Sequence, residues 1–187
     1  MLKRLVTLGL IAAGGTLLMK QMQKKHAGSG SHVVEYVDVN VPVRVAYDQF
    51  TQFEDFPQFM RSVHEIRQLD DKRLHWKADV MGKPIEWDAD ITEQIPDQRI
   101  AWRSTSGTPN GGTVSFQRLS DSRTRIKLDM YYEPTDAIEN IGDAMGAVRM
   151  EAKSNLKRFK ELIEQRGGES GAWRGTIKPD GSVSKPH

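Results

Sequence analysis

The stretch from residue 41 to residue 60, VPVRVAYDQFTQFEDFPQFM, constrains the fold of this chain more than any other. Pro42 suits the first turn of a helix, and Pro57 breaks a second, short helical turn. Apolar residues, several of them phenylalanines, recur through the stretch at mixed helical spacing. A predicted strand at 33–40 precedes these turns, and a run of strands follows them. This order indicates a sheet that wraps around a cavity rather than one that covers a solid core.

The remainder of the domain is predicted to be strands closed by one long helix. Apolar and polar residues alternate along the strands, which is typical of an antiparallel sheet with one buried and one solvated face. Apolar residues recur at steps of three and four over 137–166, which predicts a helix with one apolar stripe. We expect this helix to lie across the concave face of the sheet. The six strands before it are expected near 63–70, 73–81, 84–95, 99–105, 112–119 and 124–132.

Length and charge limit the classes of protein to consider. The 187 residues are enough for one domain with a sizeable core. The absence of cysteine excludes disulfides, thiolate zinc sites and a cysteine nucleophile. The net charge is +2, but residues 1–34 carry +5 and no acid, so the remainder carries −3. A mildly acidic body is not typical of nucleic-acid-binding proteins, so we expect no nucleic acid as a partner.

The basic N-terminal region contains an uncharged stretch at 5–19, LVTLGLIAAGGTLLM. As a helix it would span roughly 22 Å, against roughly 30 Å for a bilayer core, and flanking lysines can narrow that gap by snorkelling. We expect residues 1–25 to anchor the protein in a membrane and residues 26–32 to form a linker. A cleaved signal peptide and an interfacial helix are the alternatives. Basic residues flank the stretch almost evenly, so the side of the membrane is not predicted.

Three segments carry a resemblance to a known family: VNVPVRVAYDQFTQFEDFPQFMRSVHEI, HWKADVMGKPIEWDADITEQIPDQRIAWRS, and GGTVSFQRL with TRIKLDMYYEP. Over residues 33–166 the chain resembles the START-like helix-grip superfamily (SRPBCC), in its polyketide cyclase/dehydrase and coenzyme-Q-binding branch. The resemblance implies an α+β fold, with a curved antiparallel sheet of about seven strands around a long C-terminal helix. It also implies a cavity for an apolar ligand, in a family of enzymes, carriers and lipid transporters. The N-terminal segment resembles that of membrane-attached bacterial members.

The inward-facing positions of the strands are rich in tryptophan and methionine. Such side chains suit the wall of an apolar pocket. The pattern alone is more typical of a packed core, and the resemblance to a family that keeps a cavity reverses that preference. Gly142 and Gly146 leave room beside the long helix or mark a weak helix start, since each costs about 1 kcal/mol relative to alanine. Arg149 either binds an oxygen at the pocket mouth or is an ordinary arginine at its rim. The expected pocket residues are Phe56, Met60, Trp76, Trp87, Trp102, Phe116, Met130, Gly142, Met145 and Arg149.

Signatures of catalysis and metal binding do not stand out. The chain has no Ser-His-Asp order and no glycine-rich phosphate loop, and neither His64 nor His75 has a partner at metal-ligand spacing. We therefore expect no catalytic residue, no metal and no cofactor. Residues 167–187 are expected to be flexible, although Trp173 and Arg174 are candidates for docking on the domain, on a partner or at the membrane.

These features predict a membrane-tethered START-like protein. The favoured function is a non-catalytic binder or carrier of an apolar, membrane-derived ligand, such as a quinone, an isoprenoid or a lipid. One alternative is a cyclase or dehydratase acting on a polyketide-like or aromatic substrate. It would need an acid or base inside the cavity, where the strand alternation places almost none. The other alternative is an interaction protein with a filled core and no ligand.

Overall fold

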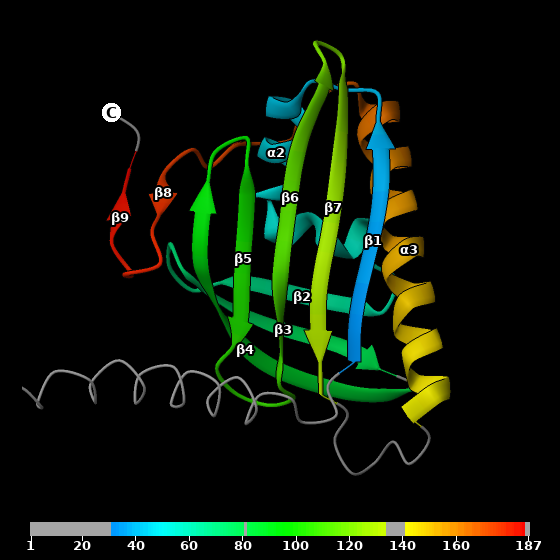
Figure 1. The fold of residues 1–187 in the computed structure, drawn as a ribbon. Coiled ribbons are helices and arrows are strands. Elements are labelled where there is room, and N and C mark those ends of the chain that lie inside the picture. The colour runs from blue at the N-terminus through cyan, green and yellow to red at the C-terminus, as the bar shows by residue number, and fades with distance from the viewer. Residues whose placement is uncertain (1–30, 81, 134–140, 186–187) are drawn as a thin grey trace, which may run out of the picture. The chain divides into compact units, whose positions relative to one another are not determined.

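The computed structural model describes residues 31–80, 82–133 and 141–185 (Figure 1). The predicted anchor at 1–25 lies outside these residues, as does most of the predicted linker at 26–32. The first strand begins at Ser31, so the last two residues of that linker belong to the sheet. Within the described ranges, no helix has both the length and the apolar character needed to cross a membrane.

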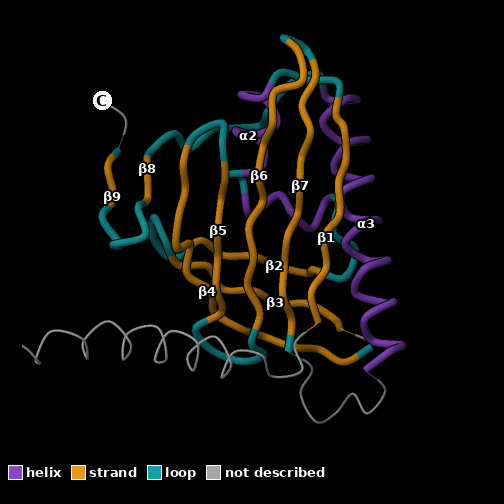
Figure 2. The backbone as a smooth tube through the Cα atoms, in the orientation of Figure 1, coloured by secondary structure: helices purple, strands orange, loops and turns teal. Residues whose placement is uncertain are grey.

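The sheet is antiparallel and strongly curved. Seven strands follow the spatial order β1-β7-β6-β5-β4-β3-β2. Figure 2 shows β2 and β3 running across the direction of β5, β6 and β7, and a register irregularity between Ile91 and Glu93 accompanies the bend of the long β4. The strands are β1 (Ser31–Val39), β2 (Val63–Gln68), β3 (Arg73–Val80), β4 (Lys83–Ile95), β5 (Arg99–Ser104), β6 (Asn110–Ser120) and β7 (Arg123–Tyr132).

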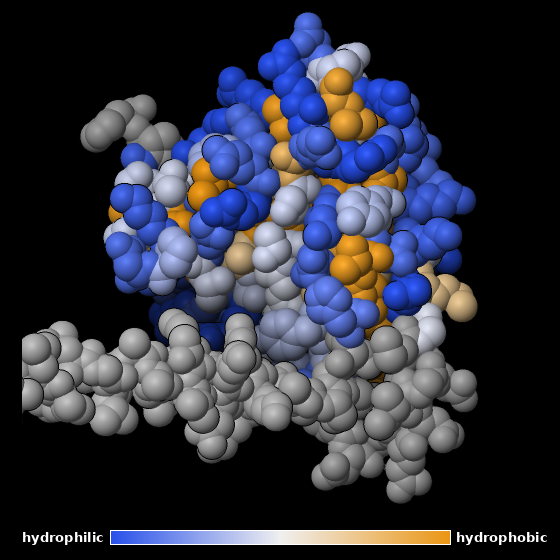
Figure 3. All heavy atoms as spheres, viewed as in Figure 1, coloured by the Kyte–Doolittle hydropathy of each residue, from blue (hydrophilic) through white to orange (hydrophobic). Residues whose placement is uncertain are grey.

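The two faces of the sheet differ as the alternation predicts. On the outer face, turned toward the viewer in Figure 3, most side chains are hydrophilic and the apolar ones are scattered. On the outer side of the pair formed by β3 and β4, His75 lies 2.7 Å from Asp88 and Lys77 lies 3.8 Å from Glu86. Glu86 and Asp88 of β4 are therefore part of a solvated surface. The apolar positions of the strands turn to the concave side.

Two short helical segments cover one end of the concave face. Helix α2 (Val43–Phe50) begins directly after Pro42, whose carbonyl accepts a hydrogen bond from Ala46 N at 3.1 Å. It ends at Thr51, whose hydroxyl donates to Asp48 O at 2.7 Å. The 3-10 helix η1 (Phe53–Gln58) follows and contains Pro57. The two helical turns predicted within 43–60 are therefore present.

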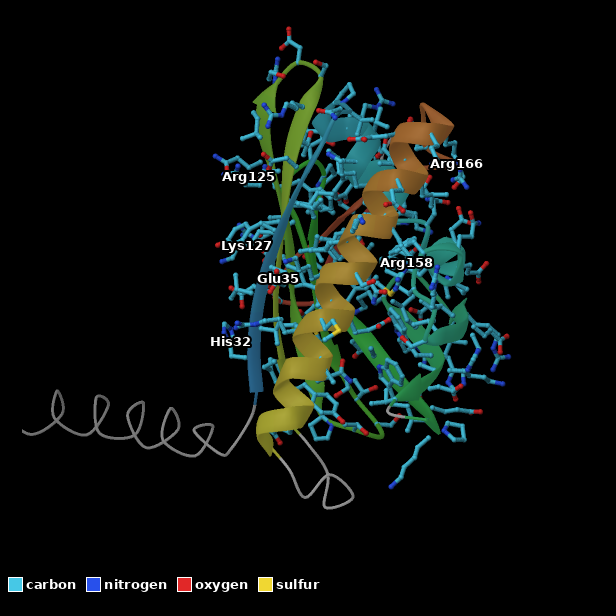
Figure 4. The ribbon with its side chains drawn as sticks, turned by 90° about the vertical axis from the view of Figure 1, so that its right-hand side faces the viewer. His32, Glu35, Arg125, Lys127, Arg158 and Arg166 are labelled. Atoms are coloured by element: carbon cyan, nitrogen blue, oxygen red, sulfur yellow. The ribbon has the colours of Figure 1, made fainter. Side chains whose placement is uncertain are left out.

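Helix α3 (Ile141–Arg166) lies along β1 and closes the concave face, as Figure 4 shows. The predicted start of this helix, at residue 137, lies outside the described residues. Ala152, Leu156, Phe159 and Ile163 are buried at steps of four and three, as the predicted apolar stripe requires. Burying a large apolar side chain stabilises a fold by about 1.5 to 3 kcal/mol, so this stripe accounts for the docking of the helix.

The C-terminal residues pack on the domain, which corrects the expectation of a flexible segment over 167–187. Strand β8 (Thr176–Ile177) pairs with β4, where Ile177 is the partner of Gln94, and β9 (Val183–Ser184) pairs with β8. Ile177 is 0% exposed. A two-residue strand has too few residues to show any periodicity, so its burial left no pattern in the sequence.

Arg174 fastens this C-terminal segment to α2. Its Nη1 lies 2.7 Å from the Oδ1 of Asp48, which is 0% exposed, and its Nη2 lies 2.8 Å from Asp97. The guanidinium also lies over the ring of Tyr47, 5.7 Å from the centroid, which is a cation–π arrangement. Burial raises the pKa of Tyr47 to about 12, so this phenol stays neutral. Of the three docking partners considered for Trp173 and Arg174, the structure shows the domain itself.

Candidate functional site

A cavity of about 400 Å³ lies between the concave face of the sheet, η1 and α3. Most of the side chains around it are apolar or aromatic, and they come from both short helical segments, from strands β3 to β7 and from α3. The sheet, α2, η1 and α3 thus surround a space that a solid core would fill with side chains.

Phenylalanines close one end of this cavity. Phe50 ends α2, and η1 with the residue after it contributes Phe53, Phe56 and Phe59, all of which are buried. Their rings contact one another, with centroids 5.2 Å apart for Phe50 and Phe56 and 5.0 Å apart for Phe56 and Phe59. Phe53, Phe56 and Phe59 recur every three residues, and a 3-10 helix has three residues per turn, so η1 directs these rings to one side. An α-helix would spread them around more of its circumference.

Tryptophans form much of the wall. Trp76 and Trp87 are cross-strand partners on β3 and β4, and their rings stack with centroids 5.3 Å apart and planes 14° apart. Neither indole nitrogen has a hydrogen-bond partner among the described residues. Trp102 of β5 donates from Nε1 to Asn110 Oδ1 at 3.3 Å. All three indoles therefore lie on the concave side, in the strand register predicted from the alternation.

Two glycines make room for these tryptophans. A Cβ on Gly112 would lie 2.8 Å from Cη2 of Trp102 and 2.5 Å from the carbonyl oxygen of Asp129. Gly107 has a φ of +67°, and a Cβ there would lie 2.9 Å from Cβ of Trp87. The strand expected near 112–119 begins at Gly112, and Gly107 lies before it in the turn; neither was expected to make room for a tryptophan. A glycine placed inside a strand was the available signal, because it marks close approach of neighbouring atoms.

The opposite end of the cavity is more exposed, and we call it the mouth. It is formed by the end of β3, the loop that leads into β6, the end of β7 and the first half of α3. The residues of the mouth are Asp79, Val80, Thr108, Asn110, Tyr132, Ala147 and Val148.

Two carboxylates belong to the described lining, Asp79 at the mouth and Glu151 on α3. Asp79 lies 2.8 Å from His64. Glu151 accepts a hydrogen bond from the Ser62 hydroxyl at 3.2 Å and lies 3.5 Å from Arg158, whose Nε donates to Phe59 O at 2.6 Å (Figure 4). Both carboxylates are thus engaged, and Arg158 links Glu151 to the backbone of Phe59. This arrangement suits binding of an apolar body with a polar group near the mouth.

The structure brings six of the ten predicted pocket residues together around the cavity. Phe116 lies outside the lining and packs in the core, 5.5 Å from Tyr47 and 5.6 Å from Phe50 between ring centroids. Arg149 points outward, and its side chain lies 3.7 Å from Glu35 of β1. Gly142 and Met145 fall outside the residues whose side chains are described. Whether the lining residues bind a ligand stays a prediction; they are Phe56, Met60, Trp76, Trp87, Trp102 and Met130.

Comparison with known proteins identifies the family. Residues 39–161 match the model of the family described as polyketide cyclase / dehydrase and lipid transport. The chain belongs to this family. A relative from Streptomyces lincolnensis, a 17.2 kDa protein of the melC2-rnhH intergenic region, is 47% identical over 148 residues, which cover 79% of this chain and 99% of the relative.

Solved structures share the fold of this polyketide cyclase/dehydrase family member. The Zhui aromatase/cyclase from Streptomyces sp. R1128 is 16% identical, with a TM-score of 0.63 over 76% of this chain and 99% of that one. A START superfamily protein from Mycobacterium smegmatis is 14% identical, with a TM-score of 0.59 over 72% and 95%. At these identities the likeness concerns the fold alone. The polyketide cyclase/dehydrase family is confirmed, while the coenzyme-Q branch and the membrane attachment stay predictions.

Proposed function

We propose that this protein binds or carries an apolar, membrane-derived small molecule, such as a quinone, an isoprenoid or a lipid, in the cavity beneath α3. The single observation that carries the proposal is the cavity itself, which is lined mainly by phenylalanine, tryptophan and aliphatic side chains. Ligand sites of this kind typically have volumes of roughly 300 to 1,000 Å³ and a few polar groups that orient the ligand. Met60 and Met130 add adaptable walls to the lining.

A membrane tether formed by residues 1–25 is part of this proposal. The uncharged stretch at 5–19, with basic residues on both sides, supports it. An apolar ligand has low solubility in water and resides in the bilayer, so a tether would keep the cavity close to its source. The binder would then work at a membrane surface.

A cyclase or dehydratase acting on a polyketide-like or aromatic substrate is the second candidate. The observation that favours it is the polar group at the mouth, where Asn110 accepts from Trp102 and the Tyr132 side chain lines the cavity. Burial raises the pKa of Tyr132, so its hydroxyl stays protonated and can donate a hydrogen bond to a substrate carbonyl. The third alternative, an interaction protein with a filled core, is disfavoured by the size of the cavity.

Tryptophan emission offers a direct test, because three of the four tryptophans line the cavity. Titrating the full-length protein in mild detergent with a short-chain benzoquinone should quench most of the emission and saturate at one molecule per chain. Trp173→Phe, which removes the tryptophan outside the cavity lining, should leave the fractional quenching equal or larger. Absence of saturable quenching, or quenching lost with Trp173→Phe, would contradict binding in the cavity. If the protein is instead incubated with a polyketide-like compound, recovery of that compound in a chemically changed form would favour the second candidate.

A further inference from the structure

The polypeptide enters the domain at the mouth of the cavity. Ser31 opens β1, and its cross-strand partner is Tyr132 at the end of β7. Tyr132 is in turn the partner of Asn110 at the start of β6. Both partners belong to the mouth. The thirty residues that precede Ser31, including the uncharged stretch at 5–19, are therefore attached beside the opening through which a ligand would pass.

The first half of α3 also borders the mouth, and its outward side carries exposed apolar atoms. Ala147 and Val148 line the mouth, while Gly146 and Met150 face solvent from the same turns. Met150 is 71% exposed, the highest fraction among the large hydrophobic side chains of the described residues. A Cβ on Gly146 would meet no atom within 4 Å. On this side of the helix, the apolar side chain of Met150 is therefore not covered by the described domain.

Basic side chains lie on the helix near Met150. Lys153 and Lys157 follow Met150 by three and seven residues, so they lie on the same side of the helix, and both are exposed. Arg149 has a side chain that is 58% exposed. Lys157 and Arg149 have only loose ion pairs, with Glu161 at 3.9 Å and Glu35 at 3.7 Å. Lysines and arginines near a bilayer are attracted to anionic headgroups, and an exposed apolar side chain among them is placed to enter the headgroup region.

We propose that the mouth docks on the surface of an anionic lipid bilayer through the outward side of α3, from Gly146 to Lys157. Met150 enters the headgroup region, and Arg149, Lys153 and Lys157 contact acidic headgroups. The inference rests on the proposed function only in taking residues 1–25 as the tether that brings the domain to the bilayer. In this orientation a ligand passes between the acyl chains and the cavity without crossing water. A second copy of the chain could cover the same side of α3, and the test separates that outcome.

The chain has no cysteine, so one introduced thiol gives one labelling site. Full-length Met150→Cys carries an environment-sensitive fluorophore and is reconstituted with vesicles of phosphatidylcholine and phosphatidylglycerol. Its emission should shift to the blue, and lipids with brominated acyl chains should quench most of it. The matched control is Ser122→Cys, in the turn that joins β6 to β7, at the end of both strands opposite the mouth (Figure 1). Its label should show neither change.

A charge-reversed variant tests the basic side chains. Lys153→Glu together with Lys157→Glu, in the Met150→Cys background, should lose most of the quenching while the tether keeps the protein sedimenting with vesicles. If labelled Met150→Cys without the charge reversal sediments with vesicles but is not quenched, or if the charge-reversed variant is quenched equally, the docking is overturned and the tether stands. A protein that does not sediment with vesicles would overturn both, while quinone quenching still reports separately on the cavity. A blue shift without lipid, together with a dimeric mass, would assign this side of α3 to a second copy and overturn the docking.

Discussion

Arg174→Met should lower the free energy of unfolding by about 3 to 5 kcal/mol, the usual cost of leaving a buried charge without its partner. Asp48 is 0% exposed and loses a contact of 2.7 Å, and Asp97 loses one of 2.8 Å. The substitution also removes the cation over the ring of Tyr47. Methionine keeps most of the length of the arginine side chain. The loss of stability therefore comes mainly from removing the charge and not from creating a cavity. Denaturant midpoints of the variant and the wild type measure the effect.

A matched control separates this buried contact from an ordinary surface one. Arg44 also contacts Asp48, at 3.3 Å, but its side chain is 67% exposed. Arg44→Met should therefore cost about 1 kcal/mol or less. Adding Asp48→Asn to Arg174→Met should recover part of the stability, because the amide removes the uncompensated charge. Equal midpoints for Arg174→Met and the wild type would show that the C-terminal segment does not stabilise the domain.

Ala152→Trp should abolish ligand uptake while leaving the protein folded. Ala152 lies on the buried stripe of α3 and lines the cavity, so the indole would occupy space that the ligand needs. We expect affinity for the short-chain benzoquinone to fall on the order of tenfold or more, which corresponds to about 1.4 kcal/mol per factor of ten. Quenching titrations give the affinity, and denaturant midpoints of the same samples give the stability.

The same substitution at Ala46 provides the comparison. Ala46 lies on helix α2 and is also buried, but it is packed in the core and is not part of the cavity lining. Overpacking a filled core costs about 1 to 3 kcal/mol, so Ala46→Trp should be the more destabilising of the two. If Ala152→Trp destabilised the protein as much as Ala46→Trp did, the space beneath α3 would be filled in solution, and the ligand proposal would fail.

The sheet and its inward face could be predicted because strand periodicity is a local property. Alternation in LHWKAD and IEWDAD placed Trp76 and Trp87 on the same face, and the structure pairs them directly. Periodicity tells which face a residue occupies but not how far along the strand the cavity extends. Phe116 therefore faces inward as predicted, yet it lies beneath α2 among core aromatic rings rather than in the lining.

Contacts between distant residues could not be predicted in this way. Arg149 lies near the edge of an apolar stripe, but its direction depends on Glu35, which lies far away in the sequence on β1. The packed C-terminal segment depends on Arg174 and Asp48, which are 126 positions apart. Their pairing follows from the three-dimensional course of the chain, and the glycine-rich composition around Arg174 resembles that of a flexible tail.

The central claim is that the cavity holds an apolar ligand, and native mass spectrometry tests it most directly. The full-length protein would be extracted from its own membrane in mild detergent and measured before and after denaturation. We expect one apolar molecule per chain, present under native conditions and released on denaturation, and recoverable unchanged by organic extraction. The Ala152→Trp variant, prepared identically, should lack it. A wild-type protein that shows only its bare mass, and that also leaves the quinone unbound, would contradict the account.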